Sequence, residues 1–385
     1  MPMLTRDDFF LRQDIRFLNH GSFGATPRVL LDECRRWQER MEQQPVLMHR
    51  ELPALMYQAR IALADYLGCK AQDVVYVTNS TFGTNVAAHA IGRTLGAGDE
   101  ILVSDHEYGA CIRAWNTHAV SRGAVIVTAH IPMPVPPIDD IVDIIWAGVT
   151  ERTRVLFLSH ITSPTAITLP IAELVRRARQ RGIITVIDGS HVPGHIPLHL
   201  DELGADIYTG NMHKWMCTPK GSAFLHVRRE LQDAIGPIVV SWGPESQSLH
   251  HSSFIDEHEY LGTRDPAPFL TVPYAIEWMT SNDWPAVQER ARTLVRWCMD
   301  ELTSIPGITA MHVDRRDEQL QMGAVLLPVG TNVDDLKRKL YDEYAIEVVV
   351  HAWRSAPIIR FSVHAHTTQH DLAALVAAVR DSFAP

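Results

Sequence analysis

Short apolar runs recur along the first part of the chain, and segments with helical spacing lie between them. Seven runs have the length and the content typical of buried strands, and they cover residues 73–78 (DVVYVT), 100–105 (EILVSD), 124–129 (AVIVTA), 154–160 (RVLFLSH), 184–190 (ITVIDGS), 206–210 (DIYTG) and 222–227 (SAFLHV). Strands that are apolar throughout are typical of a parallel sheet covered on both faces. The pattern therefore predicts an α/β fold with a seven-stranded, mostly parallel sheet and helices on both faces.

One intervening segment, IAELVRRARQRG, shows the helical spacing clearly. Its apolar residues Ile171, Leu174, Val175 and Ala178 share one helical face, and Gly182 follows where the helix should stop. The segment predicts a helix that covers the sheet.

The pattern changes from about Ser252, where a loop rich in His, Asp and Pro begins. A long helix over 285–302, weaker strands and a closing helix over 370–383 then predict a smaller α+β domain. We accordingly expect three parts: an N-terminal arm (1–20) that contributes to the active site, a large cofactor-binding domain (21–255), and an interdomain helix with a small C-terminal domain (256–385).

Composition narrows the classes of function. The 385 residues are 46% hydrophobic and carry a net charge of -10 with a pI near 6.0, which argues against a nucleic-acid partner or an anionic membrane surface and favours a small-molecule ligand. We find no apolar run long enough to span a bilayer and no signal-peptide pattern. The five cysteines lack CxxC spacing, so we expect no metal site and reduced thiols in the cytoplasm.

Polar residues at the ends of apolar strands are the candidates for a binding site, because ligands of open α/β sheets lie there. Ser80 and Thr81 follow the first run and would present amides and hydroxyls to an anion, although such residues are also common helix caps. Asp188 ends the fifth run, where a buried carboxylate needs a cationic partner; the alternative is again a helix cap.

Lys214 completes this set, in the apolar stretch TGNMHKWMCTPKGSAFL. A lysine in an apolar site has a lowered pKa and becomes a nucleophile, whereas the alternative is a surface lysine with a buried stem. An anion anchor, an acid and an amine in this order are what pyridoxal phosphate requires.

The series HGSFGATP, TNSTFGTN, DHEYGA, VIDGSHVPG, TGNMHKW, GTRD and RFSVHAHTT resembles class V of the aminotransferases over nearly the whole chain. The resemblance implies the fold-type-I architecture of pyridoxal-phosphate-dependent transferases. LNHGSFG, RELPAL, DGSHVPG, HKW, VSW and GTRD are most similar to isopenicillin N epimerase-like proteins. These motifs are specific for cofactor and fold, and much less so for the reaction.

The resemblance also implies roles. Lys214 resembles the lysine that binds the cofactor's aldehyde, and His213 a phosphate ligand beside it. Asp188 matches the acid on the pyridine nitrogen, and His191 the residue that hydrogen-bonds the phenolic oxygen. Tyr108 matches the ring stacked on the cofactor, with a core tyrosine as the alternative.

Further roles concern the phosphate, the substrate and a second subunit. Ser80, Thr81 and Phe82 match the phosphate loop, and Thr263 matches a threonine that reaches the phosphate of the neighbouring subunit, which implies a homodimer with shared active sites. Arg360 resembles the arginine that binds the substrate carboxylate. His20 lies in a loop that often touches substrate, although a solvated loop histidine is an equal alternative.

The chain also departs from the family pattern. Asn211 replaces a phosphate-binding serine, Ala166 replaces a common glycine, and His364 and His366 stand where Asn and Tyr are frequent. The segment VVVHAWRSAPIIR has no cysteine, which a desulfurase needs as a mobile thiolate.

We expect an enzyme that acts at the Cα of an amino acid, a bulky or S-conjugated cysteine of secondary (antibiotic) metabolism, by β-elimination or decarboxylation. Elimination needs one base, Lys214, whereas epimerisation needs a base on each face of the carbanion. The alternatives are an epimerase, in which a histidine at 20, 364 or 366 would supply the second face, an aminotransferase, and a protein without catalytic activity.

Overall fold

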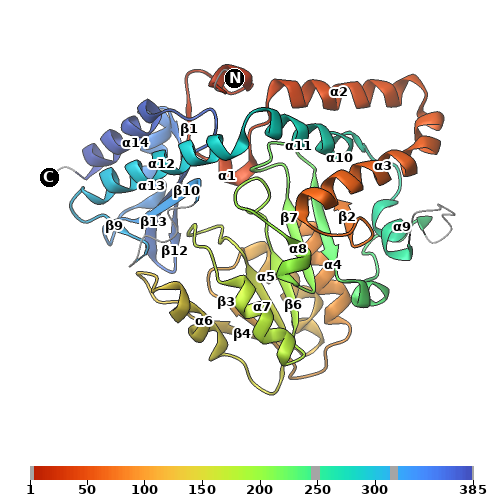
Figure 1. Cartoon of the computed structure of the whole chain (residues 1–385). Coiled ribbons are helices and arrows are strands. Elements are labelled where there is room, and N and C mark those ends of the chain that lie inside the picture. Colours follow the sequence, from red (N-terminus) through yellow and green to blue (C-terminus); the bar gives the residue numbers. More distant parts are fainter. Residues whose placement is uncertain (1–3, 244–251, 313–319, 384–385) are drawn as a thin grey trace.

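The computed structural model describes residues 4–243, 252–312 and 320–383 (Figure 1). Its larger sheet has seven strands in the order β2-β8-β7-β6-β5-β3-β4. The strands are β2 (Val74–Val77), β3 (Glu100–Ser104), β4 (Val125–Ala129), β5 (Thr153–Ser159), β6 (Ile184–Asp188), β7 (Ile207–Asn211) and β8 (Ala223–Val227). β8 pairs antiparallel with both β2 and β7, and the other four pairings of this sheet are parallel. Each of the seven predicted strands is therefore confirmed.

Both faces of the larger sheet are buried, as the apolar strands predicted. In β2, Val75 and Val77 pack into the core under α4 (Ser80–Gly92) and α5 (Gly109–His118), whereas Val74 and Tyr76 belong to the core of the opposite face. That opposite face is covered in part by α6 (Ile138–Trp146), α7 (Ile171–Gln180) and α8 (Leu200–Leu203). The four apolar residues predicted for the helix at 171–178 are the buried residues of α7.

A layer of helices that the sequence pattern did not reveal lies over one end of this sheet. In Figure 1, α2 (Arg28–Gln43) and α3 (Pro45–Leu67) run beside α10 (Ala267–Leu270) and α11 (Val272–Ser281). The short α9 (Ser253–Glu259) packs against β2. The layer thus combines α2 and α3, near the start of the large domain, with α10 and α11 from the segment that follows residue 255.

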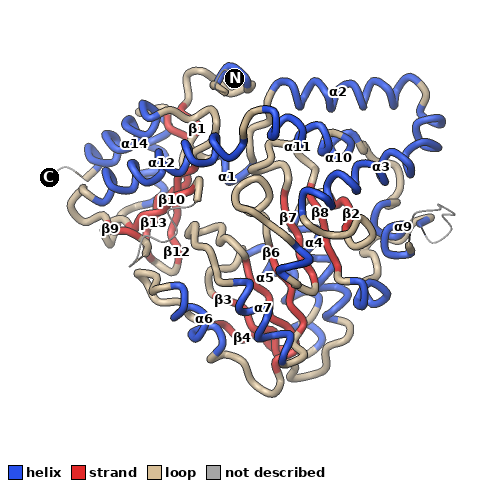
Figure 2. The backbone as a smooth tube through the Cα atoms, in the orientation of Figure 1, coloured by secondary structure: helices blue, strands red, loops and turns tan. Residues whose placement is uncertain are grey.

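The smaller sheet is antiparallel, with the order β12-β13-β10-β9. Its strands are β9 (Thr309–Ala310), β10 (Met322–Leu326), β12 (Val349–Trp353) and β13 (Ala356–Ser362), and its helices are α12 (Trp284–Thr303), α13 (Val333–Asp342) and α14 (Gln369–Ser382). Figure 2 shows this sheet apart from the larger one, with loops between the two. The predicted long helix, closing helix and α+β character are all present.

The described part of the N-terminal arm joins the small sheet's side of the molecule. After the 3₁₀ helix η1 (Arg6–Asp8), β1 (Arg16–Phe17) pairs in parallel with β11 (Ile346–Glu347), and α1 (His20–Phe23) follows. Residues 1–3 of the predicted arm lie outside the described residues. The 3₁₀ helices η2 (Val120–Arg122) and η3 (Arg229–Ala234) complete the elements. Among the described residues, no helix combines the length and apolar character needed to cross a bilayer.

Candidate active site

A cavity of about 430 Å³ opens at the carboxyl ends of the parallel strands. Ser159, Asp188 and Asn211 are the last residues of β5, β6 and β7, and all three line it. The other lining residues are Ser22, Phe23, Thr78, Asn79, Thr81, Tyr108, Ile161, Ser163, Ser190, His191, His213, Lys214, Lys220 and Gly221. The cavity therefore brings together polar groups from several strand ends, as expected for an open α/β sheet.

The amino end of α4 forms one wall. Asn79 is the residue that caps this helix, because its side-chain oxygen accepts a hydrogen bond from Phe82 N at 2.8 Å. Ser80 is buried, and its hydroxyl has no hydrogen-bond partner among the described residues. Thr81 lines the cavity, whereas Phe82 does not and packs partly buried against the core. Asn79 rather than Ser80 or Thr81 therefore caps α4, so the alternative interpretation of these two residues as helix caps is wrong.

Asn211 has a defined position beside this wall. Its Oδ1 accepts a hydrogen bond from Ser80 N at 2.9 Å, and the residue is buried. The asparagine that replaces a serine therefore holds the start of α4 against the end of β7. Ala166, which replaces a common glycine, has φ +55°, a left-handed conformation that glycine adopts more easily.

Asp188 is buried at the end of β6. Its Oδ1 accepts hydrogen bonds from the backbone and the hydroxyl of Ser190, and Cys111 Sγ lies 3.5 Å from Oδ2. Turns rather than a helix follow it, so the helix-cap alternative is excluded. Burial and the adjacent Asp188 carboxylate raise the pKa of the Cys111 thiol well above its usual value.

Lys214 extends its amine into the cavity, so it is not a surface lysine. Its Nζ lies 3.1 Å from His191 Nε2. Burial lowers the pKa of Lys214 to about 8, although the carboxylate of Asp188 opposes this shift. Burial and the charges of Lys214 and Arg360 keep the pKa of His191 well below its usual value. At neutral pH the site therefore holds a neutral imidazole beside an amine that deprotonates readily.

Two further basic residues face the cavity. His213 Nδ1 lies 3.0 Å from Ser222 O, and burial lowers the pKa of this histidine to about 4. Lys220 Nζ donates a hydrogen bond to Thr26 Oγ1 at 3.3 Å, and burial lowers the pKa of Lys220 as well. Lys220 lies six positions after Lys214, and the structure places both lysines on the same cavity.

Tyr108 lies on the cavity rim with 47% of its surface exposed, so it is not a core tyrosine. The preceding Glu107 is buried, and its carboxylate accepts hydrogen bonds from Ser159 N and Oγ and from Ser104 Oγ. Burial raises the pKa of Glu107 to about 7. Sequence reasoning missed Glu107, although the DHEYGA motif contained it.

Arg360, on β13 of the small sheet, is buried beside the cavity and contacts two of the residues that line it. Its guanidinium donates hydrogen bonds to the backbone oxygen of Ser163 and to Ser22 Oγ, the latter at 3.1 Å. Its Nε is buried without a partner among the described residues, and burial lowers the pKa of Arg360 to about 10, so it stays charged at neutral pH. Ser22 and Ser163 line the cavity, but no pattern in the sequence predicted that they would.

His20 lies elsewhere than expected. It is fully buried, with its ring stacked on His364 at 3.8 Å, and its Nε2 lies 3.0 Å from Lys214 O. It belongs to a cluster with His364, His366 and Cys217, behind the Lys214 turn, and none of the four lines the cavity. His20 is therefore neither a solvated loop residue nor part of the cavity wall, because the N-terminal arm is packed between the two domains.

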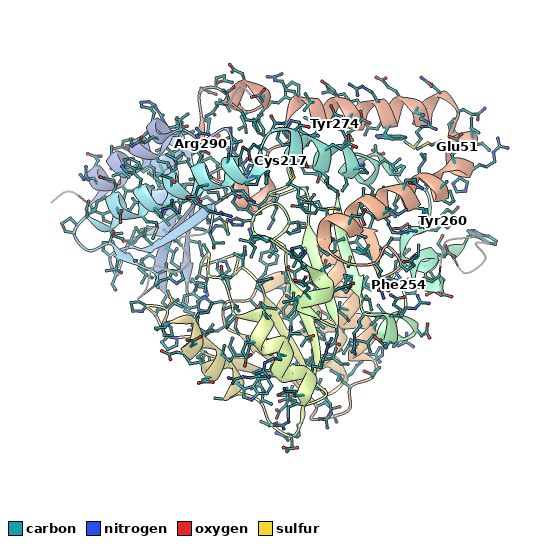
Figure 3. The ribbon with its side chains drawn as sticks, in the orientation of Figure 1. Glu51, Cys217, Phe254, Tyr260, Tyr274 and Arg290 are labelled. Atoms are coloured by element: carbon teal, nitrogen blue, oxygen red, sulfur yellow. The ribbon has the colours of Figure 1, made fainter. Side chains whose placement is uncertain are left out.

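This histidine cluster has the residue types of a metal site, but its geometry disfavours one. His20, His364 and His366 place their ring nitrogens within 4.8 Å of one another. The rings of His20 and His364 lie nearly parallel, at 6°, so their in-plane lone pairs cannot both point at one ion. Arg290 of α12 donates hydrogen bonds to Ala365 O and Thr367 O and holds the loop of this cluster (Figure 3).

Thr263 is exposed in the loop between α9 and α10 and does not line the cavity of its own chain. Its predicted contact with a neighbouring subunit's phosphate stays a prediction.

Polar residues at successive strand ends, together with Lys214 and Asp188, are the features on which the resemblance to a known family was based. The family model described as Aminotransferase class-V matches residues 25–375. The chain belongs to the class-V aminotransferase family. It is therefore an enzyme, its cofactor is pyridoxal phosphate, and its fold is that predicted from the motifs.

Relatives in this family carry several names. Isopenicillin N epimerase of Amycolatopsis lactamdurans is 34% identical over 98% of this chain and 97% of its own length. Putative L-cysteine desulfhydrase 1 of Oryza sativa subsp. japonica is 32% identical over 68% of this chain and 56% of its own length. The solved cystine C–S lyase C-DES, in complex with cysteine persulfide, has a TM-score of 0.81 at 20% identity and covers 97% of this chain and 99% of its own. The cysteine desulfurase CsdA of Escherichia coli has a TM-score of 0.81 at 22% identity over 98% of this chain and 97% of its own.

The cavity fits the cofactor of this family. Ser80, at the start of α4, is buried with its hydroxyl unpartnered among the described residues, and its neighbours Asn79 and Thr81 line the cavity at a helix N-terminus, which suits an anion. Asp188 and Lys214 line the same cavity, and the pKa of Lys214 is lowered to about 8. The residues present thus supply an anion anchor, a carboxylate and an amine within one cavity.

The segment that lacks a cysteine forms a tight hairpin. Arg354 and Ser355 make the turn between β12 and β13 with φ of +47° and +70°. Arg354 pairs with Asp105, which also contacts His130 Nδ1 at 2.9 Å. The small sheet is therefore fastened to the large domain at this turn.

Proposed function

We propose that this enzyme cleaves a bond at or next to the Cα of a bulky or S-conjugated cysteine, by β-elimination as a C–S lyase or by decarboxylation, within secondary (antibiotic) metabolism. When bound, pyridoxal phosphate supplies an electron sink for the pair released at Cα. Lys214 would hold the cofactor through its aldehyde, and its Nζ would accept or return the proton at the substrate's Cα.

The other residues bind and orient. Asp188 would supply the negative charge beside the ring nitrogen, and His191 would donate to the phenolic oxygen. Ser80, Thr81 and the amides of α4 hold the phosphate together with His213, whose lowered pKa would rise beside a dianion. Tyr108 covers the ring from the cavity rim.

Arg360 holds the substrate carboxylate. Its bonds to Ser22 and Ser163 fix the plane of the guanidinium at the cavity wall, and its unpartnered Nε leaves a donor for the incoming carboxylate. Burying a charged guanidinium without an anionic partner costs free energy. A ligand that carries a negative charge next to Arg360 would offset this cost.

The observation that carries the choice of reaction is the position of the histidines. Epimerisation needs a proton donor on the face opposite Lys214, and His20, His364 and His366 were the candidates. All three are buried behind the Lys214 turn and are absent from the cavity wall. Elimination or decarboxylation requires only Lys214 as base, and the described cavity provides it.

Epimerisation is the second candidate. The 34% identity to isopenicillin N epimerase of Amycolatopsis lactamdurans over nearly the whole chain favours it. Tyr108, on the rim and 47% exposed, is the protic side chain that such a reaction would use on the second face. Persulfide chemistry is not proposed, because the β12–β13 turn carries no thiol and Cys111 is buried with a raised pKa.

Incubation of the holoenzyme with candidate amino acids in deuterated water tests the proposal. We expect release of thiol with pyruvate and ammonia, or of carbon dioxide. An inverted, Cα-deuterated amino acid with none of these products would establish the epimerase instead. Products separated by mass spectrometry and chiral chromatography distinguish the two.

We also propose a homodimer with shared active sites. Phe23 and Tyr108 expose apolar surface at the cavity rim, and Trp242 is 68% exposed. A second subunit would cover such surface and bring Thr263 to the partner's phosphate. Five unpaired cysteines support the proposed cytoplasmic location.

A further inference from the structure

Trp215 follows the lysine directly and lies beneath it, fully buried. Its indole Nε1 donates a hydrogen bond to His191 Nδ1 at 3.3 Å. An indole nitrogen is a donor only, so Nδ1 of His191 must be the accepting, unprotonated nitrogen. Because burial keeps this imidazole neutral, its single proton must be on Nε2.

That Nε2 faces the reactive amine. It lies 3.1 Å from Lys214 Nζ, so the protonated Nε2 donates and the lysine amine accepts. An ammonium group has no lone pair and cannot accept, so this hydrogen bond forms in the deprotonated state of Lys214, which its pKa of about 8 makes accessible. The indole thus acts on Lys214 through the tautomer of His191.

The position of the indole is itself fixed by packing. The ring of His195 lies 4.1 Å from it, and a Cβ on Gly21 would lie 3.2 Å from Trp215 Cζ2. His195 is held in turn, since its Nδ1 lies 2.9 Å from His191 O and its Nε2 accepts from Gln321 N. The rings of His20 in the N-terminal arm and His364 in the small domain lie 5.4 and 6.0 Å from the indole, so all three parts of the chain pack around this one side chain.

We propose that Trp215 is a positioning residue that fixes the proton of His191 on Nε2 and so presents an N–H donor to Lys214 and to the cofactor's phenolic oxygen. The proposal rests on the role of Lys214 given above. Its consequence is that the donor favours the free amine over the ammonium form of Lys214, and that the same donor would face the phenolic oxygen of the bound cofactor.

Trp215→Phe removes the N–H and keeps an aromatic ring, and Trp284→Phe is the matched control. Trp284 is also buried, and its Nε1 donates to Gly194 O at 2.9 Å rather than to a histidine. Full-length protein labelled with ¹⁵N-histidine, with and without pyridoxal phosphate, reports the tautomer, and the His191→Asn spectrum assigns the signal. We expect a protonated Nε2 in the native and Trp284→Phe proteins and a mixed or reversed tautomer in Trp215→Phe.

The rate of covalent cofactor attachment against pH gives a second readout. The pH of half-maximal rate should rise by about half to one unit in Trp215→Phe and stay unchanged in Trp284→Phe. If His191 of the native protein is protonated on Nδ1, the proposal is wrong, even where Trp215→Phe fails to fold. If Trp215→Phe folds and its tautomer or its pH profile is unchanged, the proposal is also wrong. Failure of native protein to attach the cofactor through Lys214 would instead refute the role of that lysine.

Discussion

The two sides of the Lys214 turn are both rich in histidine, yet they differ in how their polar atoms are satisfied. On the cavity side, Ser80 Oγ and Arg360 Nε are buried without partners among the described residues. Behind the turn, His20 and His366 bond to each other, and Cys217 Sγ lies 3.5 Å from His364 Nε2. A buried polar atom without a partner costs free energy unless a ligand supplies one, so the cavity side is built to bind and the rear side to hold the structure together.

Lys214→Ala should produce the largest effect on the cavity side. It removes both the covalent anchor and the base, so activity should fall by at least about 10³-fold and no borohydride-reducible attachment should remain. Mass spectrometry of the reduced protein measures the attachment. Lys220→Ala, on the same cavity, is the control that should keep it; a reducible adduct in Lys214→Ala would transfer the role to another lysine.

Arg360→Ala should weaken substrate binding by roughly 2 to 5 kcal/mol, since it leaves a desolvated carboxylate unpaired. Cofactor affinity should change little, because the phosphate and ring contacts lie on other elements. Separate titrations of the apoenzyme with cofactor and of the holoenzyme with an unreactive amino-acid analogue give both values. Arg360→Lys, which keeps the charge without the planar fork, should recover part of the loss; equal weakening of both affinities would refute the assignment.

His364→Gln tests the rear side. It should lower the free energy of unfolding by about 1 to 3 kcal/mol through lost buried hydrogen bonding, and leave cofactor attachment intact. Urea denaturation near neutral pH measures the loss, and His370→Gln on the exposed face of α14 is the control. Loss of the covalent cofactor without loss of stability would show that the two sides are not distinct.

The same histidine should make the enzyme sensitive to acid. Burial lowers the pKa of His364 to about 3, below that of the unfolded chain. As the pH falls below about 6.5, His364 gains a proton in the unfolded state but not in the folded state. The free energy of unfolding therefore declines by up to about 1.4 kcal/mol per pH unit for this residue. The decline continues until the pH reaches the pKa of His364 in the folded state. Urea midpoints at about pH 7 and pH 5 should differ less in His364→Gln than in the native protein.

Thr263→Ala should have the smallest effect. Loss of one hydrogen bond to the partner's phosphate would weaken cofactor binding by about 1 kcal/mol, or roughly fivefold, while an isolated subunit would show no change. Cofactor titration at protein concentrations above and below dimer dissociation separates these cases. A fully active monomer would remove Thr263 from the site.

The large sheet could be predicted from sequence because its signals are local. Apolar runs, their polar ends and the face of α7 lie within single segments, and the structure has each of them. The cap of α4 was ambiguous because Asn79 and Ser80 are neighbours with the same capping chemistry, and only the coordinates of Phe82 N decide between them.

Other features depend on contacts between distant segments. The Arg360 contact with Ser22 spans 338 positions, and no local pattern marks Ser22 or Ser163. His20 follows an asparagine and precedes a glycine, a context that predicts an exposed loop, but packing between the domains buries it. The helical layer of α2, α3, α10 and α11 likewise forms only when segments far apart in the sequence meet.

The pairing of β1 with β11 has a consequence for biosynthesis. The ribosome makes Arg16 330 positions before its strand partner Ile346. Domains generally fold as units during synthesis, but β1 has no strand partner until β11 has emerged. The nascent large domain must therefore wait with His20 undocked and the Lys214 carbonyl uncovered, and the site should mature only once β11 has left the ribosome.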